Sequence, residues 1–544
     1  MSERSIQTTG RSAAIDRLER EVFDCVVIGG GITGAGIARA AGLRGLRAAL
    51  LEADDFSIGT SSRSSKLIHG GLRYLAMGDV LLVRSAALER KVIHRLAPHL
   101  AEPRWMVVPV GTRAGLAKVR VGIATYEKLG SVEKPDLHSN WSREDLEREE
   151  PLIDRERYPY ACAYREYLTD DTRLVLANLR AAAGNGNEVL NRARVDAIAT
   201  EQGRAAGVEA VCGVSGRRFH VRARAVINAA GPWVDAVRRL EAPDAPAMLH
   251  LSKGVHIVLR AEQLPVRNML VLGTRDKRSI FAIRRGPVTF VGTTDTTYAP
   301  GSQVWPEIDL EDVEYLLAPL KRYLSAPELA PRDVVAAWAG LRPLIAQPGK
   351  PPTEISRRDE VLVGPHGVVT IAGGKLTGYR PMARTALEKA AEVCGLALAP
   401  EPDEEPPLPG GDFDGDLDAL AQRVSRDTGR SASSAARLVR LYGSEAFDVV
   451  GMGPEPLVPG CELLAGEVDW AVAREGAVSV EDVVYRRSRT ALYEPEERET
   501  VLEPIGTRMA AALGWSAEQT ALHVAEARAR MSAELGFERQ GAAA

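Results

Sequence analysis

The spacing of apolar residues near the N-terminus predicts a strand, a helix and a second strand. The first strand is expected in the run DCVVIGGG from Asp24, the helix in GAGIARAAGLRGL from Gly34, and the second strand in RAALLEA from Arg47. Short apolar runs indicate buried strands, whereas apolar residues that recur at intervals of three and four indicate one face of a helix. This βαβ opening is typical of an α/β domain.

The middle of the chain changes to short alternating segments rich in valine, isoleucine, phenylalanine and threonine. They begin with LSKGVHIVLR at Leu251, and the run SIFAIRRGPVTFVGTTD predicts a hairpin around Arg284–Pro287. We expect an antiparallel sheet of a second domain here. A further buried strand is predicted in VVTIAGG from Val368, followed by a helix.

The two ends of the chain have different patterns. Residues 1–20 are polar and are expected to form a disordered tail. Residues 399–414, APEPDEEPPLPGGDFD, are rich in proline, glycine and acid and predict a linker. In residues 415–544 apolar positions recur at intervals of three and four, which predicts a separate helical domain.

Composition narrows the functional classes. The net charge of −4 and a pI of about 6.2 lack the basic excess of a nucleic-acid-binding protein, so no nucleic-acid partner is expected. Five scattered cysteines without a CxxC pair predict neither a disulfide framework nor a metal site. The first twenty residues lack the apolar core of a secretory signal, and no window approaches the ~18 apolar residues of a spanning helix. Any membrane contact is therefore expected to be peripheral.

Residues 29–34 match the pattern G-x-G-x-x-G between the first predicted strand and the helix. In this pattern Gly29 permits the tight turn, Gly31 lets the backbone approach a pyrophosphate, and Gly34 lets the helix pack close to the strand. Glu52 ends the second strand, where an acid accepts hydrogen bonds from ribose hydroxyls and argues against a 2′-phosphate. The motif predicts dinucleotide binding, but alone it does not separate NAD from FAD.

A dense run of hydroxyls and cations, SSRSSKLIHGGLRYLAMGD, begins at Ser61. The hydroxyls nearest to its start belong to Thr60, Ser61, Ser64 and Ser65. They are suited to bond a second phosphate or the edge of a flavin ring, and the alternative is a solvated serine-rich loop. An NAD enzyme would be expected to continue with another helix and strand, so this run favours FAD.

The two longest motifs are IGGGITGAGIARAAGLRG and GTSSRSSKLIHGGLRYL, and others follow in DDTRLVLANLRAAA, INAAGPWVD, KGVHIVL, FVGTTDTTY, LRPL, ISRRDEV and GGKLTGYR. Together these runs resemble the FAD-dependent (aerobic, quinone-linked) glycerol-3-phosphate dehydrogenase family. The resemblance covers roughly residues 22–395, and it continues more loosely into the helical end through VVYRRSRTAL and MAAALGW.

The resemblance implies oxidation of sn-glycerol 3-phosphate to dihydroxyacetone phosphate, with hydride passing from substrate C2 to flavin N5 and electrons then passing to a membrane quinone. Members of the family are typically peripheral membrane homodimers. We therefore expect a cytoplasmic homodimer that is peripheral on the inner face of the cell membrane. Two alternatives stay open: an oxidase that reduces O₂ to hydrogen peroxide, and a flavin-binding scaffold without turnover.

The resemblance also implies the fold class, α/β (α+β overall). It comprises a Rossmann-like FAD-binding domain of the glutathione-reductase/D-amino-acid-oxidase type, an antiparallel-sheet substrate domain and a C-terminal helical domain. The oxidoreductase region is expected to span residues 21–398. Its FAD-binding parts are about 21–85, 155–248 and 353–398, and its substrate or cap parts are about 86–154 and 249–352.

A phosphate monoester carries about −1.5 to −2 charges near neutral pH, so its site needs arginines or amide donors. By resemblance, Arg73, Tyr74 and Arg357 bind the substrate, although Arg358 beside Arg357 leaves that alignment ambiguous. For an arginine outside a motif, the alternative is a surface salt bridge.

Three residues are expected to be catalytic: His256, Arg342 and Lys375. His256 is the candidate general base, since a neutral imidazole accepts a proton near pH 7. His69 competes for that role, although orienting the flavin loop suits it better, and Arg342 is the alternative group to stabilise an alkoxide. Lys375 follows two glycines at the start of a helix, where a cation stabilises negative charge on a reduced flavin.

The cofactor-binding residues are expected to be Gly29, Gly31, Ile32, Thr33, Gly34, Glu52, Thr60, Ser61, Ser64, Lys66, Leu67, Gly231, Gly374, Leu376 and Thr377. One hairpin departs from the family pattern: Arg284-Arg285-Gly286 stands where an aromatic-acid turn is more usual, so the partner of this turn is open. The run RWMVVPVGTRAGLAKVRVGIATY is basic and suits an anionic membrane surface, with an ordinary amphipathic face as the alternative.

Overall fold

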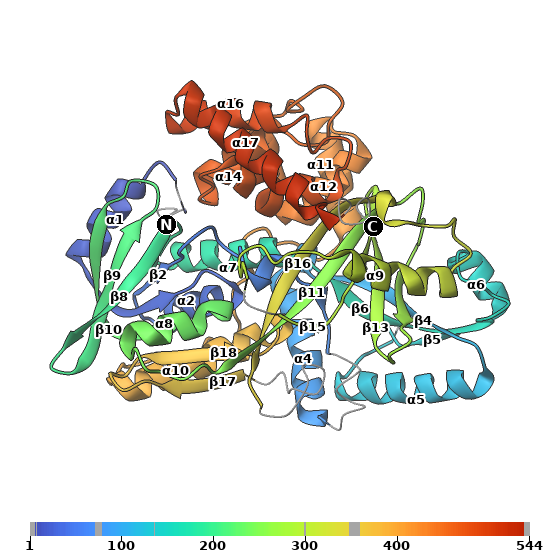
Figure 1. Cartoon of the computed structure of the whole chain (residues 1–544), viewed down its shortest axis with the longest axis horizontal. Helices are drawn as coiled ribbons and strands as arrows, with labels where there is room; N and C mark the ends of the chain where they lie inside the picture. Colours follow the sequence, from blue (N-terminus) through green and yellow to red (C-terminus); the bar gives the residue numbers. More distant parts are fainter. Residues whose placement is uncertain are drawn as a thin grey trace.

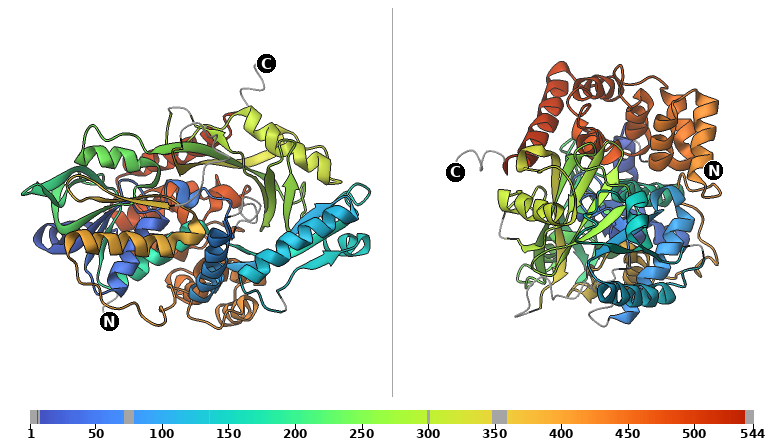
Figure 2. Two further views of the ribbon diagram at one scale, coloured as in Figure 1. Left: turned by 90° about the horizontal axis from the view of Figure 1, so that it is seen from below. Right: turned by 90° about the vertical axis from the view of Figure 1, so that its right-hand side faces the viewer.

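The computed structural model describes residue 6 and residues 8–70, 79–134, 136–298, 301–347 and 359–537. Two β-sheets lie next to each other, and helices from the C-terminal part of the chain gather on one side of them (Figures 1 and 2). This arrangement confirms the predicted α/β fold with an antiparallel second domain and a helical C-terminal part.

The first sheet follows the order β17-β18-β10-β1-β2-β7, in which β17 is antiparallel to β18 and the other neighbours are parallel. These strands are β1 (Val22–Ile28), β2 (Ala48–Leu51), β7 (Glu188–Leu190), β10 (Arg218–Asn228), β17 (Asp359–Val363) and β18 (Val369–Gly373). The antiparallel strands β8 (Ala193–Glu201) and β9 (Arg204–Cys212) extend it through β10. The predicted βαβ opening is therefore confirmed.

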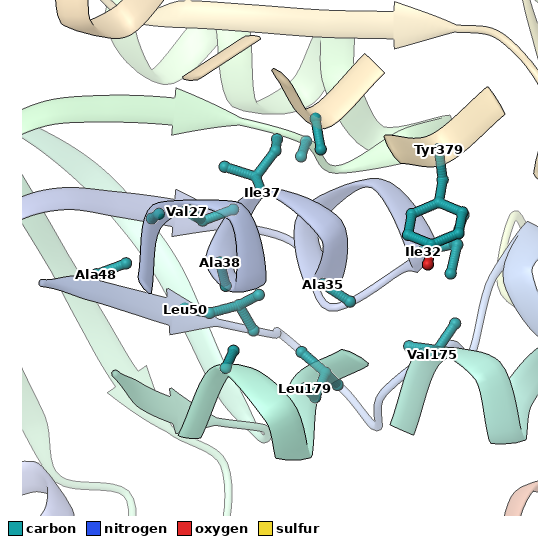
Figure 3. Close-up of a cluster of buried hydrophobic side chains, with 14 of the residues drawn as sticks. Val27, Ile32, Ala35, Ile37, Ala38, Ala48, Leu50, Val175, Leu179 and Tyr379 are labelled. Carbon is teal, nitrogen blue, oxygen red and sulfur yellow. The ribbon is translucent and has the colours of Figure 1, made fainter. Parts of the chain in front are cut away.

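Side chains of β1 alternate between two cores on opposite faces of this sheet. Val27 points into the core that also holds residues of three helices, whereas Val26 and Ile28 belong to the other core. Figure 3 shows Ala35, Ala38 and Leu179 gathered in the first core. The three helices are α2 (Ile32–Leu43), α7 (Asp171–Gly184) and α10 (Tyr379–Cys394). Burial on both faces explains why the second half of β1, residues 25–28, reads as a continuous apolar run.

Residues 1–20 were expected to form a disordered tail, but residues 11–20 form helix α1 (Arg11–Arg20). Ile15 and Leu18 stand three positions apart, share one face of the helix and are buried against the first sheet. Arg17 pairs with Glu188 of β7 at 2.7 Å. The apolar stripe is short, and the surrounding polar residues conceal it in the sequence.

The second sheet, which belongs to the cap, lies beside the first and is mainly antiparallel. Its main path is β15-β11-β14-β13-β12-β4-β6-β3, with β16 on β11 and β5 on β6, and β12 runs parallel to β4. Its strands are β3 (Leu67–Ile68), β4 (Glu102–Val110), β5 (Ser139–Trp141), β6 (Tyr160–Leu168), β11 (Leu249–Arg260), β12 (Met269–Gly273), β13 (Ser279–Arg285), β14 (Val288–Gly292), β15 (Thr296–Thr297) and β16 (Val334–Ile345). The pairing of Arg285 with Val288 confirms the predicted hairpin.

Helices cover the cap sheet and make up the C-terminal part. Those of the cap are α4 (Val80–Leu96), α5 (Arg113–Leu129), α6 (Arg143–Glu149) and α9 (Leu310–Tyr323), and α8 (Val234–Glu241) packs on the first sheet. The C-terminal helices are α11 (Leu417–Thr428), α12 (Ala432–Tyr442), α13 (Ala446–Met452), α14 (Ala465–Arg474), the π-helical turn η7 (Asp482–Arg487), α15 (Thr490–Tyr493), α16 (Leu502–Leu513) and α17 (Ala517–Glu534).

Residues 399–414, predicted as a linker, contain no helix or strand, yet they are anchored to the first domain. Leu408 is buried in its core, and Glu405 pairs with both Arg39 of α2 and Arg380 of α10. The segment is therefore a fixed strap rather than a loose tether.

Candidate active site

A cavity of about 1930 Å³ lies where the two sheets meet. The first sheet contributes residues at the carboxyl ends of its parallel strands, among them Ile28, Leu51 and Gly373, while the cap contributes His256 and Arg342. Ligands of open α/β sheets bind at this end of the strands, because the loops there diverge and the helix N-termini point toward the crevice.

The glycine-rich turn has the close packing that its pattern requires. Gly29 has a φ of +112°, and a Cβ added there would lie 2.6 Å from the carbonyl oxygen of Ala229. A Cβ on Gly34 would lie 1.9 Å from the carbonyl oxygen of Gly29, so this glycine lets α2 approach β1. Gly29, Gly31, Ile32 and Thr33 line the cavity, whereas Gly34 does not. The turn therefore presents the N-terminus of α2 to the cavity, as anion binding requires.

Glu52 lies beside this turn at the end of β2. Its two carboxylate oxygens accept hydrogen bonds from the backbone N–H of Gly30 at 2.6 Å and of Asp54 at 2.8 Å. Burial raises the pKa of Glu52 to about 7, although these two hydrogen bonds oppose the increase. The carboxyl group lines the cavity in a fixed orientation and is able to accept hydrogen bonds from a ligand hydroxyl.

The serine-rich loop is fixed by hydrogen bonds to β16 and to the start of α2. Thr60 Oγ1 donates to the carbonyl of Leu341 at 2.6 Å, and Ser61 Oγ accepts from the N–H of Ile32 at 3.0 Å. Thr60, Ser61, Ser64, Ser65 and Leu67 line the cavity. The serine-rich run is thus an ordered wall of the cavity, not the solvated loop that was the alternative.

Lys66 departs from its predicted role in cofactor binding. Its side chain is fully buried, it does not line the cavity, and its Nζ pairs with Asp171 at 2.8 Å. The sequence pattern cannot show on which side of the loop a single cation points, because a φ of +57° at Lys66 reverses the local alternation.

The far wall of the cavity carries the remaining predicted cofactor residues. Gly231, Gly374, Leu376 and Thr377 line it, together with Lys375. Thr377 Oγ1 donates to the carbonyl of His69 at 3.1 Å and accepts from its N–H at 3.2 Å, which joins the two walls. Lys375 precedes the turn that leads into α10, so a cation and a helix N-terminus face the cavity together.

His256 lies on β11 with its ring in the cavity wall. Its Nε2 is 2.9 Å from Ser65 Oγ, and its ring stacks on Trp338 with centroids 4.8 Å apart. Burial lowers the pKa of His256 well below its ordinary value, and the nearby cations Lys66 and Arg342 lower it further. The imidazole is therefore neutral near pH 7.

Arg342 lies on the neighbouring strand β16, whose register places it opposite Ser252 of β11. Its guanidinium pairs with Asp295 at 3.2 Å and donates to Thr293 Oγ1 at 2.9 Å. Thr293 and Asp295 come from the FVGTTD run, which the sequence predicts as part of a hairpin but not as the support of this arginine. A TTD run directly after a strand is the signal that identifies them.

Three predicted substrate residues, Arg73, Tyr74 and Arg357, lie outside the described residues, as does Arg358. Among the described positions, the structure brings His256, Arg342 and Lys375 into one cavity with every predicted cofactor residue except Gly34 and Lys66.

The comparisons with known proteins agree with this geometry. The family model described as FAD dependent oxidoreductase matches residues 24–380, and the model described as C-terminal domain of alpha-glycerophosphate oxidase matches residues 404–520. A relative from Staphylococcus haemolyticus named aerobic glycerol-3-phosphate dehydrogenase is 34% identical over 531 residues, which is 95% of each chain. The chain belongs to the aerobic glycerol-3-phosphate dehydrogenase family.

Two further relatives support the assignment, and a third protein shares the fold alone. An aerobic glycerol-3-phosphate dehydrogenase from Staphylococcus epidermidis is 36% identical over 505 residues, covering 89% of this chain and 90% of its own. The glycerol-3-phosphate dehydrogenase from Bacillus halodurans, solved in complex with FAD, superposes with a TM-score of 0.81 at 30% identity over 98% of this chain and 99% of its own. The L-alpha-glycerophosphate oxidase from Mycoplasma pneumoniae shares the fold, with a TM-score of 0.56 at 17% identity over 70% of this chain and 97% of its own.

FAD is the cofactor of aerobic glycerol-3-phosphate dehydrogenases, as the sequence led us to expect. The residues present suit it: a glycine turn and helix N-terminus for the pyrophosphate, the fixed acid Glu52 for a ribose, and Lys375 for the anionic side of the ring. The walls of one continuous cavity carry all three.

Proposed function

We propose that this protein oxidises sn-glycerol 3-phosphate at C2 to dihydroxyacetone phosphate. The observation that carries the proposal is the single cavity that joins the glycine turn of the first domain to His256 and Arg342 of the cap. FAD bound there supplies a hydride acceptor. As the C2–H bond breaks, the hydride leaves, the hydroxyl proton passes to a base, and the alcohol becomes a ketone.

His256 is the base in this proposal. A neutral imidazole is the form that accepts a proton, and the lowered pKa keeps His256 in that form near pH 7. The hydrogen bond between Nε2 and Ser65 Oγ and the stack on Trp338 hold the ring in one orientation. His69, the other histidine of the cavity wall, is the alternative base.

Arg342 and Lys375 supply the positive charge. Arg342 is oriented by Asp295 and Thr293, so its guanidinium meets an alkoxide or a phosphate without reorganising. Lys375 lies near the N-terminal end of α10, where its charge and the helix dipole act together on negative charge that develops at the cofactor. Arg73, Tyr74 and Arg357 stay predicted as further substrate ligands.

The test of this proposal is anaerobic reduction of the FAD-containing protein. Mixing with sn-glycerol 3-phosphate is expected to bleach the yellow flavin absorbance, whereas glycerol, which lacks the phosphate, and lactate, which carries a carboxylate instead, leave it unchanged. Equal bleaching by glycerol would exclude a phosphate-selective site, and no bleaching by any of the three would overturn the proposal.

A quinone is the electron acceptor that we favour over O₂. The cavity also extends along β4, β13 and α5, where apolar residues such as Val108, Val119 and Phe281 line it together with the charged residues Lys118, Asp276, Lys277 and Arg278. The apolar side chains in this part of the cavity suit a lipophilic quinone better than a polar substrate of three carbons. Stoichiometric hydrogen peroxide formed in air without quinone would instead support the oxidase alternative.

A peripheral position at the membrane agrees with this acceptor. None of the helices in the described ranges combines the length and the apolar character that crossing a bilayer requires. Helices α4 and α5 pack together and expose Leu81 and Val121, the latter to 64%. Basic residues such as Lys118 accompany them, which is the composition that binds an anionic membrane surface. Attachment to the inner face of the cell membrane and homodimer formation stay predictions.

A further inference from the structure

Two adjacent aspartates at the start of α7 form ion pairs with basic residues from three distant parts of the chain. Asp171 pairs with Lys66 of the serine-rich loop at 2.8 Å and with Arg489 of the C-terminal part at 2.9 Å. Asp170 pairs with Arg285 of the cap hairpin at 2.8 Å and with Arg489 at 3.3 Å. Apart from the partly buried Arg285, all of these groups are at most 1% exposed in their side chains. This cluster also answers which partner the unusual Arg284-Arg285-Gly286 turn has.

The aspartate pair controls the position of the residue that touches His256. Asp171 Oδ2 accepts hydrogen bonds from the N–H of Ser64 at 3.1 Å and from its Oγ at 2.7 Å. Ser65 is therefore held between two residues, Ser64 and Lys66, that are both fixed on Asp171. Its own Oγ lies 2.9 Å from His256 Nε2.

The C-terminal part also forms ion pairs with Asp55, which precedes this loop in the chain. Arg487 donates to Asp55 Oδ1 at 2.8 Å, and Arg486 pairs with the same carboxylate. Both belong to the π-helical turn η7, and Arg489 follows with a φ of +66°, a left-handed conformation that is unusual for a residue other than glycine. The turn thereby directs arginines to Asp55 and Asp171, on either side of the loop that lines the cavity.

We propose that Arg489 is a positioning residue for the base, so that the C-terminal helical domain completes an active site whose walls it does not line. Arg489 neutralises and orients the aspartate pair, Asp171 fixes Ser64 and Lys66, and Ser65 between them orients the imidazole of His256. This inference rests on the proposed role of His256.

The experiment compares Arg489→Met and Arg489→Lys with Arg180→Met in the FAD-containing protein. Arg180 is a matched control, because it also joins α7 to the C-terminal part, through Glu445 at 2.6 Å, and it touches neither the loop nor the cavity. We expect Arg489→Met to slow anaerobic reduction by sn-glycerol 3-phosphate by roughly tenfold or more, since loss of orientation costs rate. Arg489→Lys restores part of the rate, and Arg180→Met stays within about twofold of the native rate.

A second readout separates positioning from general loss of structure. The groups that face His256 are Ser65, Lys66, Arg342 and Trp338, and burial among them keeps its titration well below the ordinary value of 6.5. Loosening the loop admits water, so the titration of His256 followed by NMR of carbon-13-labelled histidine moves up toward 6.5 in Arg489→Met but not in Arg180→Met. The signal of His256 is assigned with His256→Gln. This readout does not require turnover, so it tests the inference even if the proposed substrate fails.

A native rate together with a native His256 titration in folded Arg489→Met would overturn the inference. So would equal losses in Arg489→Met and Arg180→Met. If Arg489→Met does not fold, Ser64→Ala takes its place, because this variant removes the hydroxyl bond from the loop to Asp171 while the Lys66 ion pair stays, so no buried charge loses its partner. In that variant, an unchanged His256 titration contradicts the inference.

Discussion

At the scale of single residues, the proposed chemistry depends on a neutral histidine next to a fixed cation. His256 is kept neutral by burial and by the positive charges of Lys66 and Arg342. Arg342 is kept in place by Asp295, which also accepts a hydrogen bond from Ser252. The base and the cation stand on neighbouring strands, and this proximity lets one stabilise the alkoxide that the other creates.

The pH dependence of flavin reduction tests the base. A base must be unprotonated, so the rate falls only on the acidic side of its pKa, and the low pKa of His256 predicts a rate that is flat from about pH 6 to 8. His256→Gln is expected to lower the rate by roughly 10²-fold or more. His250→Gln is the matched control, since His250 lies on the same strand β11 but does not line the cavity. Equal rates in the two variants would assign the proton to another group, with His69 the next candidate.

Glu52 gives a second pH dependence, in the protein stripped of FAD. Its pKa is raised from 4.5 to about 7, so it favours folding at low pH, and that contribution is lost as the pH rises through this interval. The free energy of unfolding of the native chain is expected to fall by about 2–3 kcal/mol more than that of Glu52→Gln between pH 4.5 and 8. Urea unfolding at both pH values measures it, with the exposed Glu388→Gln as control. Parallel losses in native chain and Glu52→Gln would contradict the assignment.

At the scale of elements, periodicity predicts whether a segment forms a helix or a strand, but the register between strands decides which residues meet in the site. The βαβ opening and the Arg284–Pro287 hairpin follow from local patterns, because turn residues and alternation are local properties. That His256 of β11 stands opposite Trp338 of β16 depends on a register between strands about 80 residues apart, which alternation does not encode. Helix α1 escaped prediction because its burial depends on contact with a distant strand.

The contact of α2 with β1 is open to a direct test at Gly34. A Cβ there would lie 1.9 Å from the carbonyl oxygen of Gly29, so Gly34→Ala forces the helix away from the turn that faces the cavity. We expect at least a tenfold weaker affinity for FAD, measured by flavin fluorescence titration. Gly184→Ala, in another helix and with open space around it, is the control and keeps native affinity. Native affinity in Gly34→Ala would refute the close-packing role of this glycine.

At the scale of the whole molecule, the cavity exists only because the two sheets meet. Motifs in the sequence identify the glycine turn, the serine-rich run and GGKLTGYR separately, each as a local pattern. Their convergence on one space, and the burial of Lys66 against Asp171 rather than in that space, result from packing between segments more than a hundred residues apart. Such contacts leave no periodic signal, so the cavity could be anticipated only through resemblance.

The part of the cavity along β4, β13 and α5 is the proposed binding place of the quinone that takes electrons from the flavin. Gly122 of α5 lines it and has open space around its Cβ position, so Gly122→Leu places a bulky side chain in this space. We expect turnover with a lipophilic quinone to fall by roughly tenfold while anaerobic reduction by sn-glycerol 3-phosphate keeps its rate. Ala124→Leu, on the exposed side of the same helix, is the control. Slower reduction by the substrate in Gly122→Leu would instead identify this space as the substrate entrance.

The central claim, removal of a hydride from C2 of sn-glycerol 3-phosphate in this cavity, is tested most directly with deuterated substrate. In anaerobic stopped-flow mixing, substrate carrying deuterium at C2 is expected to reduce the flavin several-fold more slowly than unlabelled substrate, because the C2–H bond breaks in that step. Substrate with deuterium only at C1 is expected to react at the unlabelled rate. Reduction at the same rate with both labels, or no reduction of the flavin by this substrate, would contradict the account.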